Sequence, residues 1–186
     1  MVRKQPDTIS PAQVNALRVA LPTVDLKPGE MHVAGTPTLI SSVLGSCVSI
    51  CLYSPEKKIG AMCHCLLPSR KQGRLRSHNP CCCVDSCVSH MVETLASQHG
   101  VQRHHLQAKL FGGASVLESG SPPAGSNATM GCRNIEAARQ VLQEHALKIA
   151  AERVGGVQGY RLFFHSGTGE AFLRHVRNSR RKELPP

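Results

Sequence analysis

Apolar residues along this chain follow two spacings, one typical of helices and one typical of strands. A helix is predicted over residues 84–99, because apolar side chains recur there every three or four positions and Gly100 follows as a C-cap. A second helix is predicted over residues 133–145 on the same grounds. Ser10 and Pro11 resemble a helix start, which predicts a short helix that ends before Pro22.

Runs rich in Val, Ile, Leu and Cys predict the strands. Residues 38–53 indicate a strand, a tight turn at Gly45 and a second strand, and residues 59–67 indicate another strand closed by Pro68. Later strands are predicted over 107–111, 147–154, 160–165 and 170–176, the last two as a hairpin. About seven strands and two long helices, mixed rather than alternating, favour an α+β fold.

The chain divides into three predicted parts. Residues 1–29 are expected to be a partly disordered N-terminal extension, residues 30–176 the folded domain, and residues 177–186 a basic tail. The chain has neither an apolar run long enough to cross a bilayer nor the apolar block of a signal peptide, so a cytoplasmic protein is expected. The nine cysteines are an odd number, which favours free thiols over disulfides.

Charge adds a preference for acidic partners. The formal net charge is +10, and the basic residues gather in two groups. The groups comprise Lys71, Arg74, Arg76 and His78, and then Arg174, His175, Arg177, Arg180, Arg181 and Lys182. The simpler alternative is a soluble basic surface. No aromatic residues are interleaved with the basic ones, and no helix-turn-helix or zinc-finger pattern is present, so no nucleic acid is expected as a partner.

One stretch carries candidate chemistry for a cysteine hydrolase. Cys47 follows Gly45 and Ser46, which allow a sharp turn whose free backbone N–H groups can stabilise an oxyanion. His64, near the end of the next strand, can accept the thiol proton. Ser41 is the candidate for orienting the imidazole. The alternatives are a buried core cysteine at position 47 and an ordinary strand hydroxyl at position 41.

A second group of residues has a loose resemblance to a zinc site. It comprises Cys63, Cys65, His78, Cys81, Cys82, Cys83 and Cys87. Structural zinc sites usually draw ligands in pairs with two to four residues between them, whereas a single residue separates Cys63 from Cys65. Three adjacent cysteines do not all face one metal ion. We therefore predict a reduced, cysteine-rich loop and no metal; the alternative is a zinc-dependent nucleic-acid binder.

Several separated motifs stand in order along the chain. They are Leu44-Gly-Ser-Cys-Val-Ser-Ile-Cys-Leu-Tyr53, Ile59-Gly-Ala-Met-Cys-His64, Leu66-Leu-Pro68, Ala108-Lys-Leu-Phe-Gly-Gly-Ala-Ser115, Met130-Gly-Cys-Arg-Asn-Ile135 and Ala151-Glu-Arg-Val-Gly-Gly156. Together they resemble the CheD family of chemoreceptor glutamine deamidases over about residues 30–176. In that family the cysteine of the Gly-Ser-Cys turn is the nucleophile, here Cys47, and the histidine before Leu-Pro is the base, here His64. The third member is a threonine six residues before the cysteine, where this chain has Ser41.

The resemblance implies a fold, a reaction and partners. The fold would consist of β-sheets packed together with helices on the outside. The reaction would convert glutamines of methyl-accepting chemotaxis receptors to glutamate with release of ammonia, through a cysteine thioester and without a cofactor. The protein would meet the membrane only through those receptors. Some family members bind a CheC-type phosphatase, so a non-catalytic chemotaxis adaptor is the alternative function.

Overall fold

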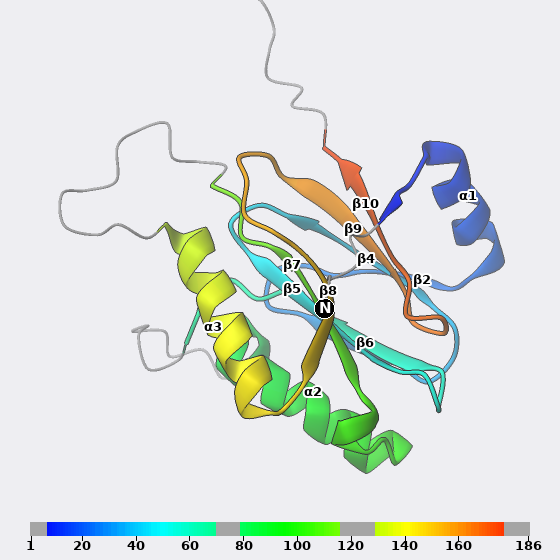
Figure 1. Ribbon diagram of the computed structural model, residues 1–186. Coiled ribbons are helices and arrows are strands. Elements are labelled where there is room, and N and C mark those ends of the chain that lie inside the picture. Colours follow the sequence, from blue (N-terminus) through cyan, green and yellow to red (C-terminus); the bar gives the residue numbers. More distant parts are fainter. Residues whose placement is uncertain (1–6, 70–78, 116–128, 177–186) are drawn as a thin grey trace, which may run out of the picture.

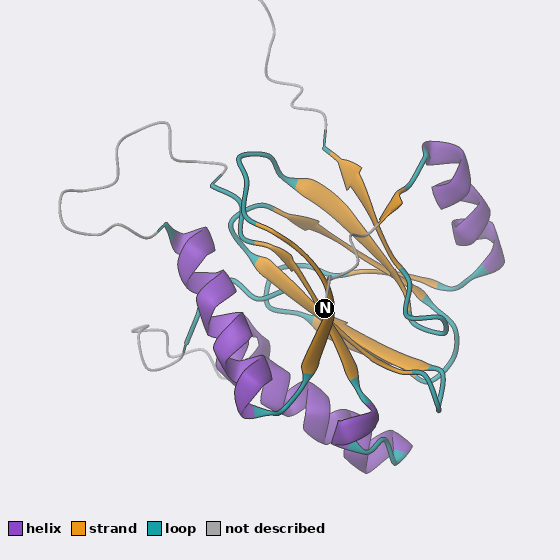
Figure 2. Ribbon diagram, viewed as in Figure 1, coloured by secondary structure: helices purple, strands orange, loops and turns teal. Residues whose placement is uncertain are grey.

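Four layers make up the described part of this computed structural model, which comprises residues 7–69, 79–115 and 129–176. Two five-stranded sheets pack face to face. Helices α2 (Val84–His99) and α3 (Met130–Glu144) cover the outer face of one sheet, and α1 (Pro11–Ala20) lies against the other (Figures 1 and 2). The predicted α+β fold with packed sheets and outer helices is therefore confirmed.

Sheet A lies under α2 and α3. Its strand order is β3-β6-β5-β7-β8, and its neighbours are antiparallel except for the parallel pair β7 and β8. The bounds are β3 (Met31–Ala34), β5 (Val48–Ser54), β6 (Ile59–Cys63), β7 (Gln107–Gly112) and β8 (Lys148–Val154). Helix α3 connects the two parallel strands, as a crossover connection requires.

Sheet B has the order β1-β10-β9-β4-β2. The bounds are β1 (Asp7–Thr8), β2 (Thr23–Asp25), β4 (Leu39–Leu44), β9 (Tyr160–His165) and β10 (Ala171–His175). Strand β4 pairs with β9, and β9 pairs with β10, both antiparallel. The short strands β1 and β2 pair in parallel with β10 and β4. The β9–β10 hairpin agrees with the sequence-based prediction.

The N-terminal segment corrects one prediction. Residues 7–25, expected to lie in an extension, supply β1, α1 and β2 to sheet B and its outer layer. Ile9 and Val14 are buried against Leu39 and Phe163, which gives the segment its own apolar contact with the domain. The Ser10 side chain caps α1 in a capping box with Gln13, as the Ser-Pro start predicted for its N-terminus. Residues 1–6 and 177–186 lie outside the described residues.

Strand alternation separates the core into an inner and an outer cluster. Val48, Ile50 and Leu52 of β5 face α2 and α3, whereas Cys51 faces sheet B. In β4, Ile40 and Leu44 face sheet A. This alternation decides which side chains of the two strands can meet between the sheets.

The predicted helices and long strands agree with the structure, with small shifts at their ends. Helix α2 has the predicted bounds, and Gly100 caps it in the left-handed conformation. Helix α3 begins three residues earlier than predicted, because the Thr129 side chain caps it through the Cys132 N–H. The prediction did not include β1, β2, β3 or the 3₁₀ helices η2 (Pro80–Cys82) and η3 (Arg103–His105). No helix in the described ranges is long and apolar enough to span a bilayer.

Candidate active site

The turn at residues 45–47 carries the chain from sheet B into sheet A. It joins the end of β4 to the start of β5, and these two strands do not pair with each other. Gly45, Ser46 and Cys47 are all half-buried, in contrast to the buried residues on either side of them. Cys47 is thus held at the edge between the two sheets, where a substrate can approach its thiol.

Backbone contacts from the end of β7 fix the shape of this turn. The N–H of Gly113 donates to the carbonyl of Cys47, and that of Ala114 donates to the carbonyl of Gly45, both at 2.8 Å. Gly112 has a φ of +100°, and a Cβ placed on it would lie 2.2 Å from the Cys47 oxygen. Only glycine can occupy position 112 without displacing the turn.

Asn134 connects the turn to the segment that follows His64. Its side chain is fully buried, and its Nδ2 donates to the carbonyls of Ser46 at 3.0 Å and Leu66 at 2.9 Å. Both partners are acceptors, which assigns the nitrogen rather than the oxygen to this side of the amide. Sequence reasoning did not single out this residue. The sequence feature that could have identified Asn134 is its polar side chain next to Ile135, on the face of the helix that is buried.

The register of the two strands places Cys47 and His64 on the same face of sheet A. Strands β5 and β6 are antiparallel, and their pairing continues as a bridge between Val48 and Cys65. Cys47 and His64 are therefore diagonal neighbours on the face that looks toward sheet B. Diagonal Cα atoms in antiparallel pairs are about 7–8 Å apart, within reach of an imidazole and a thiol. The contact between Cys47 and His64 stays a prediction, and the register of β5 and β6 supports it.

A serine of sheet B orients the imidazole. The Ser42 hydroxyl donates to the Leu26 carbonyl at 2.9 Å, so its oxygen accepts from His64 Nδ1 at 2.7 Å. The inferred tautomer carries its hydrogen on Nδ1 and a lone pair on Nε2. Nε2 is buried and has no hydrogen-bond partner among the described residues. This leaves Nε2 free to accept a proton.

Ser41, the residue predicted for this role, faces the other way. Its hydroxyl donates to Asp25 Oδ1 and accepts from Arg161 Nη1 at 3.3 Å. Successive residues of a strand point to opposite faces, and Ser42 shares its face with Ile40 and Leu44. The prediction that Ser41 contacts the imidazole is therefore corrected to Ser42. Both serines are flanked by apolar residues, so the sequence offered no signal for choosing between them.

Burial sets the protonation of the pair. It raises the pKa of the Cys47 thiol, although a hydrogen bond from the residue's own N–H opposes the shift. It also lowers the pKa of His64, against the opposing influence of Cys63, the Leu26 carbonyl and Glu30. Both shifts disfavour the charged forms. Burial therefore favours a neutral thiol at Cys47 and a neutral imidazole at His64.

The other predicted cysteines divide between two places. Cys63, Cys65 and Cys87 come together, with all three thiols buried. Cys82 and Cys83 lie outside that group, and His78 lies outside the described residues. Cys63 and Cys65 flank His64 in the chain, but their side chains lie in the cluster under the helices and not in the one between the sheets. These thiols therefore face away from the site at Cys47.

Comparison with known proteins gives consistent results. A family model described as "CheD chemotactic sensory transduction" matches residues 66–175. "Probable chemoreceptor glutamine deamidase CheD 2" of Geobacter sulfurreducens is 40% identical over 84% of this chain and 91% of its own. "Probable chemoreceptor glutamine deamidase CheD" of Maridesulfovibrio salexigens is 35% identical over 82% and 91%. Bacillus licheniformis protein YfiH, a solved structure, has a TM-score of 0.44 and 11% identity over 68% of this chain and 49% of its own.

Proposed function

Because this chain belongs to the CheD family, we propose that it is a chemoreceptor glutamine deamidase in which Cys47 is the nucleophile and His64 the general base. The observation that carries this proposal is the arrangement of the pair. A half-buried thiol lies diagonally from an imidazole whose Nδ1 is held by Ser42 and whose Nε2 has no hydrogen-bond partner among the described residues. This arrangement supports activation of the cysteine by a neighbouring base.

In the first step, His64 Nε2 takes the Cys47 proton as the sulfur attacks the side-chain amide carbon of a receptor glutamine. The resting pair is neutral, so proton transfer accompanies the attack and does not precede it. Backbone N–H groups of the 45–47 turn would stabilise the oxyanion. Gly113, Ala114 and Asn134 hold that turn through its carbonyls, which supports this role.

The second half of the reaction returns the enzyme to its resting state. Protonated His64 gives its proton to the departing ammonia, which leaves a γ-glutamyl thioester on Cys47. A water molecule, deprotonated by His64, then attacks the thioester carbonyl. Glutamate is released and the thiol is protonated again. The sum is glutamine and water giving glutamate and ammonia, so the reaction balances without a redox or group-transfer cofactor.

The test is ammonia release from receptor cytoplasmic fragments, combined with mass spectrometry of each glutamine. Conversion adds about 1 Da per site and one negative charge, because an amide becomes a carboxylate. Cys47→Ser and His64→Ala should abolish conversion, while Cys132→Ser, which changes an exposed cysteine on α3, should leave it intact. Full activity in Cys47→Ala would refute the proposed mechanism.

A CheC-type phosphatase is the proposed second partner, carried over from the family resemblance. Cys47→Ala would test binding apart from catalysis, because it removes the proposed nucleophile and alters only one half-buried side chain. Capture of the phosphatase by Cys47→Ala at wild-type affinity would support binding that does not depend on turnover. Failure of both wild type and variant to capture it would remove this partner.

A further inference from the structure

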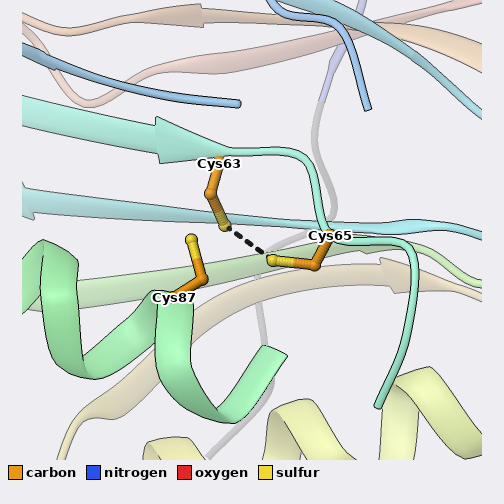
Figure 3. A group of neighbouring side chains, drawn as sticks. All are labelled: Cys63, Cys65 and Cys87. Atoms are coloured by element: carbon orange, nitrogen blue, oxygen red, sulfur yellow. Dashed lines mark hydrogen bonds between the residues drawn. The ribbon is translucent and has the colours of Figure 1, made fainter. Parts of the chain in front are cut away.

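Three buried thiols converge beneath helix α2, on the far side of sheet A from the proposed active site. Cys63 ends β6, Cys65 follows two residues later, and Cys87 lies in the first turn of α2. Their sulfur atoms all lie within 4.8 Å of one another, and those of Cys63 and Cys65 are 3.6 Å apart. Figure 3 shows the three side chains pointing toward a common point between the strand and the helix.

A fourth thiol, that of Cys81 in the 3₁₀ helix η2, lies beside Cys87 but outside the group of three whose sulfurs are all within 4.8 Å of one another. The sulfur of Cys81 lies 2.6 Å from that of Cys87, closer than two uncoordinated atoms of this size pack. With Zn–S bonds of about 2.3 Å, the sulfurs of a tetrahedral site lie about 3.8 Å apart. The three thiols of the group approach that spacing already, and Cys81 joins them only if its side chain moves away from Cys87 and toward Cys63 and Cys65.

We propose that Cys63, Cys65 and Cys87, with Cys81 as the fourth ligand, form a tetrahedral thiolate site for Zn²⁺. Thiolates are soft ligands, which select zinc over magnesium or calcium. Four protein ligands make a closed, structural site with no position for substrate. The sequence predicted no metal, because a single residue separates Cys63 from Cys65 and three adjacent cysteines do not all face one ion. The fold brings Cys63, Cys65 and Cys87 together.

Ordinary core packing explains these cysteines less well. All four are at most 2% exposed, within the cluster under the helices. A core-filling cysteine such as Cys51 lies apart, in the apolar cluster between the sheets. Three sulfurs that converge, with a fourth beside Cys87, add polar atoms to a core that alanine or valine would fill. Coordination gives each sulfur a partner.

The site also has a source of electrostatic compensation. Metal binding releases the four thiol protons, and Zn²⁺ with four thiolates carries a net charge of −2. Cys87 stands in the first turn of α2, a helix of 16 residues whose N-terminal dipole favours negative charge. The charged cluster is thereby placed at the favourable end of the helix.

The bound metal would position the strand that carries His64. Cys63 and Cys65 flank that residue, and the N–H of Cys65 donates to the Val48 carbonyl at 2.8 Å, next to Cys47. Zinc would tie this segment to the start of α2. Its loss should therefore reduce deamidation indirectly, by loosening His64, and lower the midpoint of thermal unfolding.

Metal content of the protein purified under reducing conditions tests the proposal directly. One zinc per chain is expected by elemental analysis, falling to below a tenth in Cys65→Ser and Cys87→Ser but unchanged in Cys132→Ser. Because a ligand variant can fail to fold, wild-type protein stripped by chelator and titrated with Co²⁺ provides a second readout. It should show thiolate-to-cobalt charge transfer and the visible bands of a tetrahedral site, saturating at one equivalent.

The result is independent of the deamidation proposal. Cys47→Ala, inactive under the proposed mechanism, should still bind one zinc. Absence of zinc in the wild type together with no tetrahedral cobalt spectrum overturns the metal site and leaves the deamidase proposal standing. A Cys81–Cys87 disulfide that persists under reducing purification also overturns it, because those sulfurs are then unavailable as ligands.

Discussion

Two adjacent serines of β4 offer a matched test of how the imidazole is held. Ser41 and Ser42 are both 2% exposed, yet their hydroxyls point to opposite faces of sheet B. Ser42→Ala removes the acceptor of His64 Nδ1 and the donor to the Leu26 carbonyl. Ser41→Ala removes contacts with Asp25 and Arg161 on the outer face. The two variants therefore delete the same atom on either side of one strand.

The expected cost follows from what each deletion leaves unpaired. Leaving a buried polar group unsatisfied costs about 1–3 kcal/mol, and Ser42→Ala deprives two such groups. If about 2 kcal/mol falls on the transition state, kcat decreases roughly 30-fold. KM should change little, because Ser42 contacts the base and not the substrate. Ser41→Ala should retain activity within about twofold, since its partners are partly exposed charges.

The assay is steady-state ammonia release from a receptor fragment, with unfolding curves for each variant. Ser42→Thr keeps the hydroxyl and should recover most of the lost kcat, which a merely space-filling role for Ser42 does not explain. Equal losses in Ser41→Ala and Ser42→Ala, or full activity in Ser42→Ala, would refute the reasoning and return the orienting role to another group.

Three further predictions concern the turn and its thiol. Asn134→Ala leaves the Ser46 and Leu66 carbonyls unpaired and should cost about 2–4 kcal/mol in unfolding free energy and at least tenfold in kcat, whereas exposed Arg133→Ala should not. Gly112→Ala should lower the midpoint of thermal unfolding and kcat far more than Gly100→Ala. Both glycines have positive φ, but a Cβ at position 100 meets nothing within 4 Å, whereas one at position 112 meets the Cys47 oxygen. Similar effects of the two substitutions would contradict the importance of that contact. Burial raises the pKa of Cys47, so the rate at which iodoacetamide labels this residue should be low at neutral pH and increase through the alkaline range. Peptide mass spectrometry measures that rate. A labelling rate that reaches a plateau near pH 6–7 would instead indicate a preformed ion pair.

Local patterns carried most of the fold. The helix over 84–99 had apolar periodicity and a glycine cap, and both are local signals. The strands β1 and β2 have only two and three residues and form by pairing with β10 and β4. No local sequence pattern predicts such a pairing. Because these pairings are not local, the N-terminal segment was predicted to be an extension. In the structure, residues 7–25 supply two strands to sheet B and a helix to its outer face.

The candidate site divides along the same line. Cys47 and His64 could be predicted, because a Gly-Ser turn and the next strand are close in sequence and the family motifs include both residues. Ser42 and Asn134 could not, because each acts across a tertiary contact. The choice between Ser41 and Ser42 depends on which face of β4 meets sheet A. The contacts of Cys87 with Cys81 and with Cys63 and Cys65 depend on how η2 and α2 dock.

The crossing of the chain between sheets at residues 45–47 has a consequence for how this protein fails. Cys47 and His64 belong to sheet A, whereas Ser42 belongs to sheet B, so neither sheet contains a complete site. Turnover therefore requires the two sheets to be packed against each other, and an intact sheet alone is not enough. On heating, activity should disappear as the sheets part, ahead of the far-ultraviolet circular dichroism signal of the strands and helices.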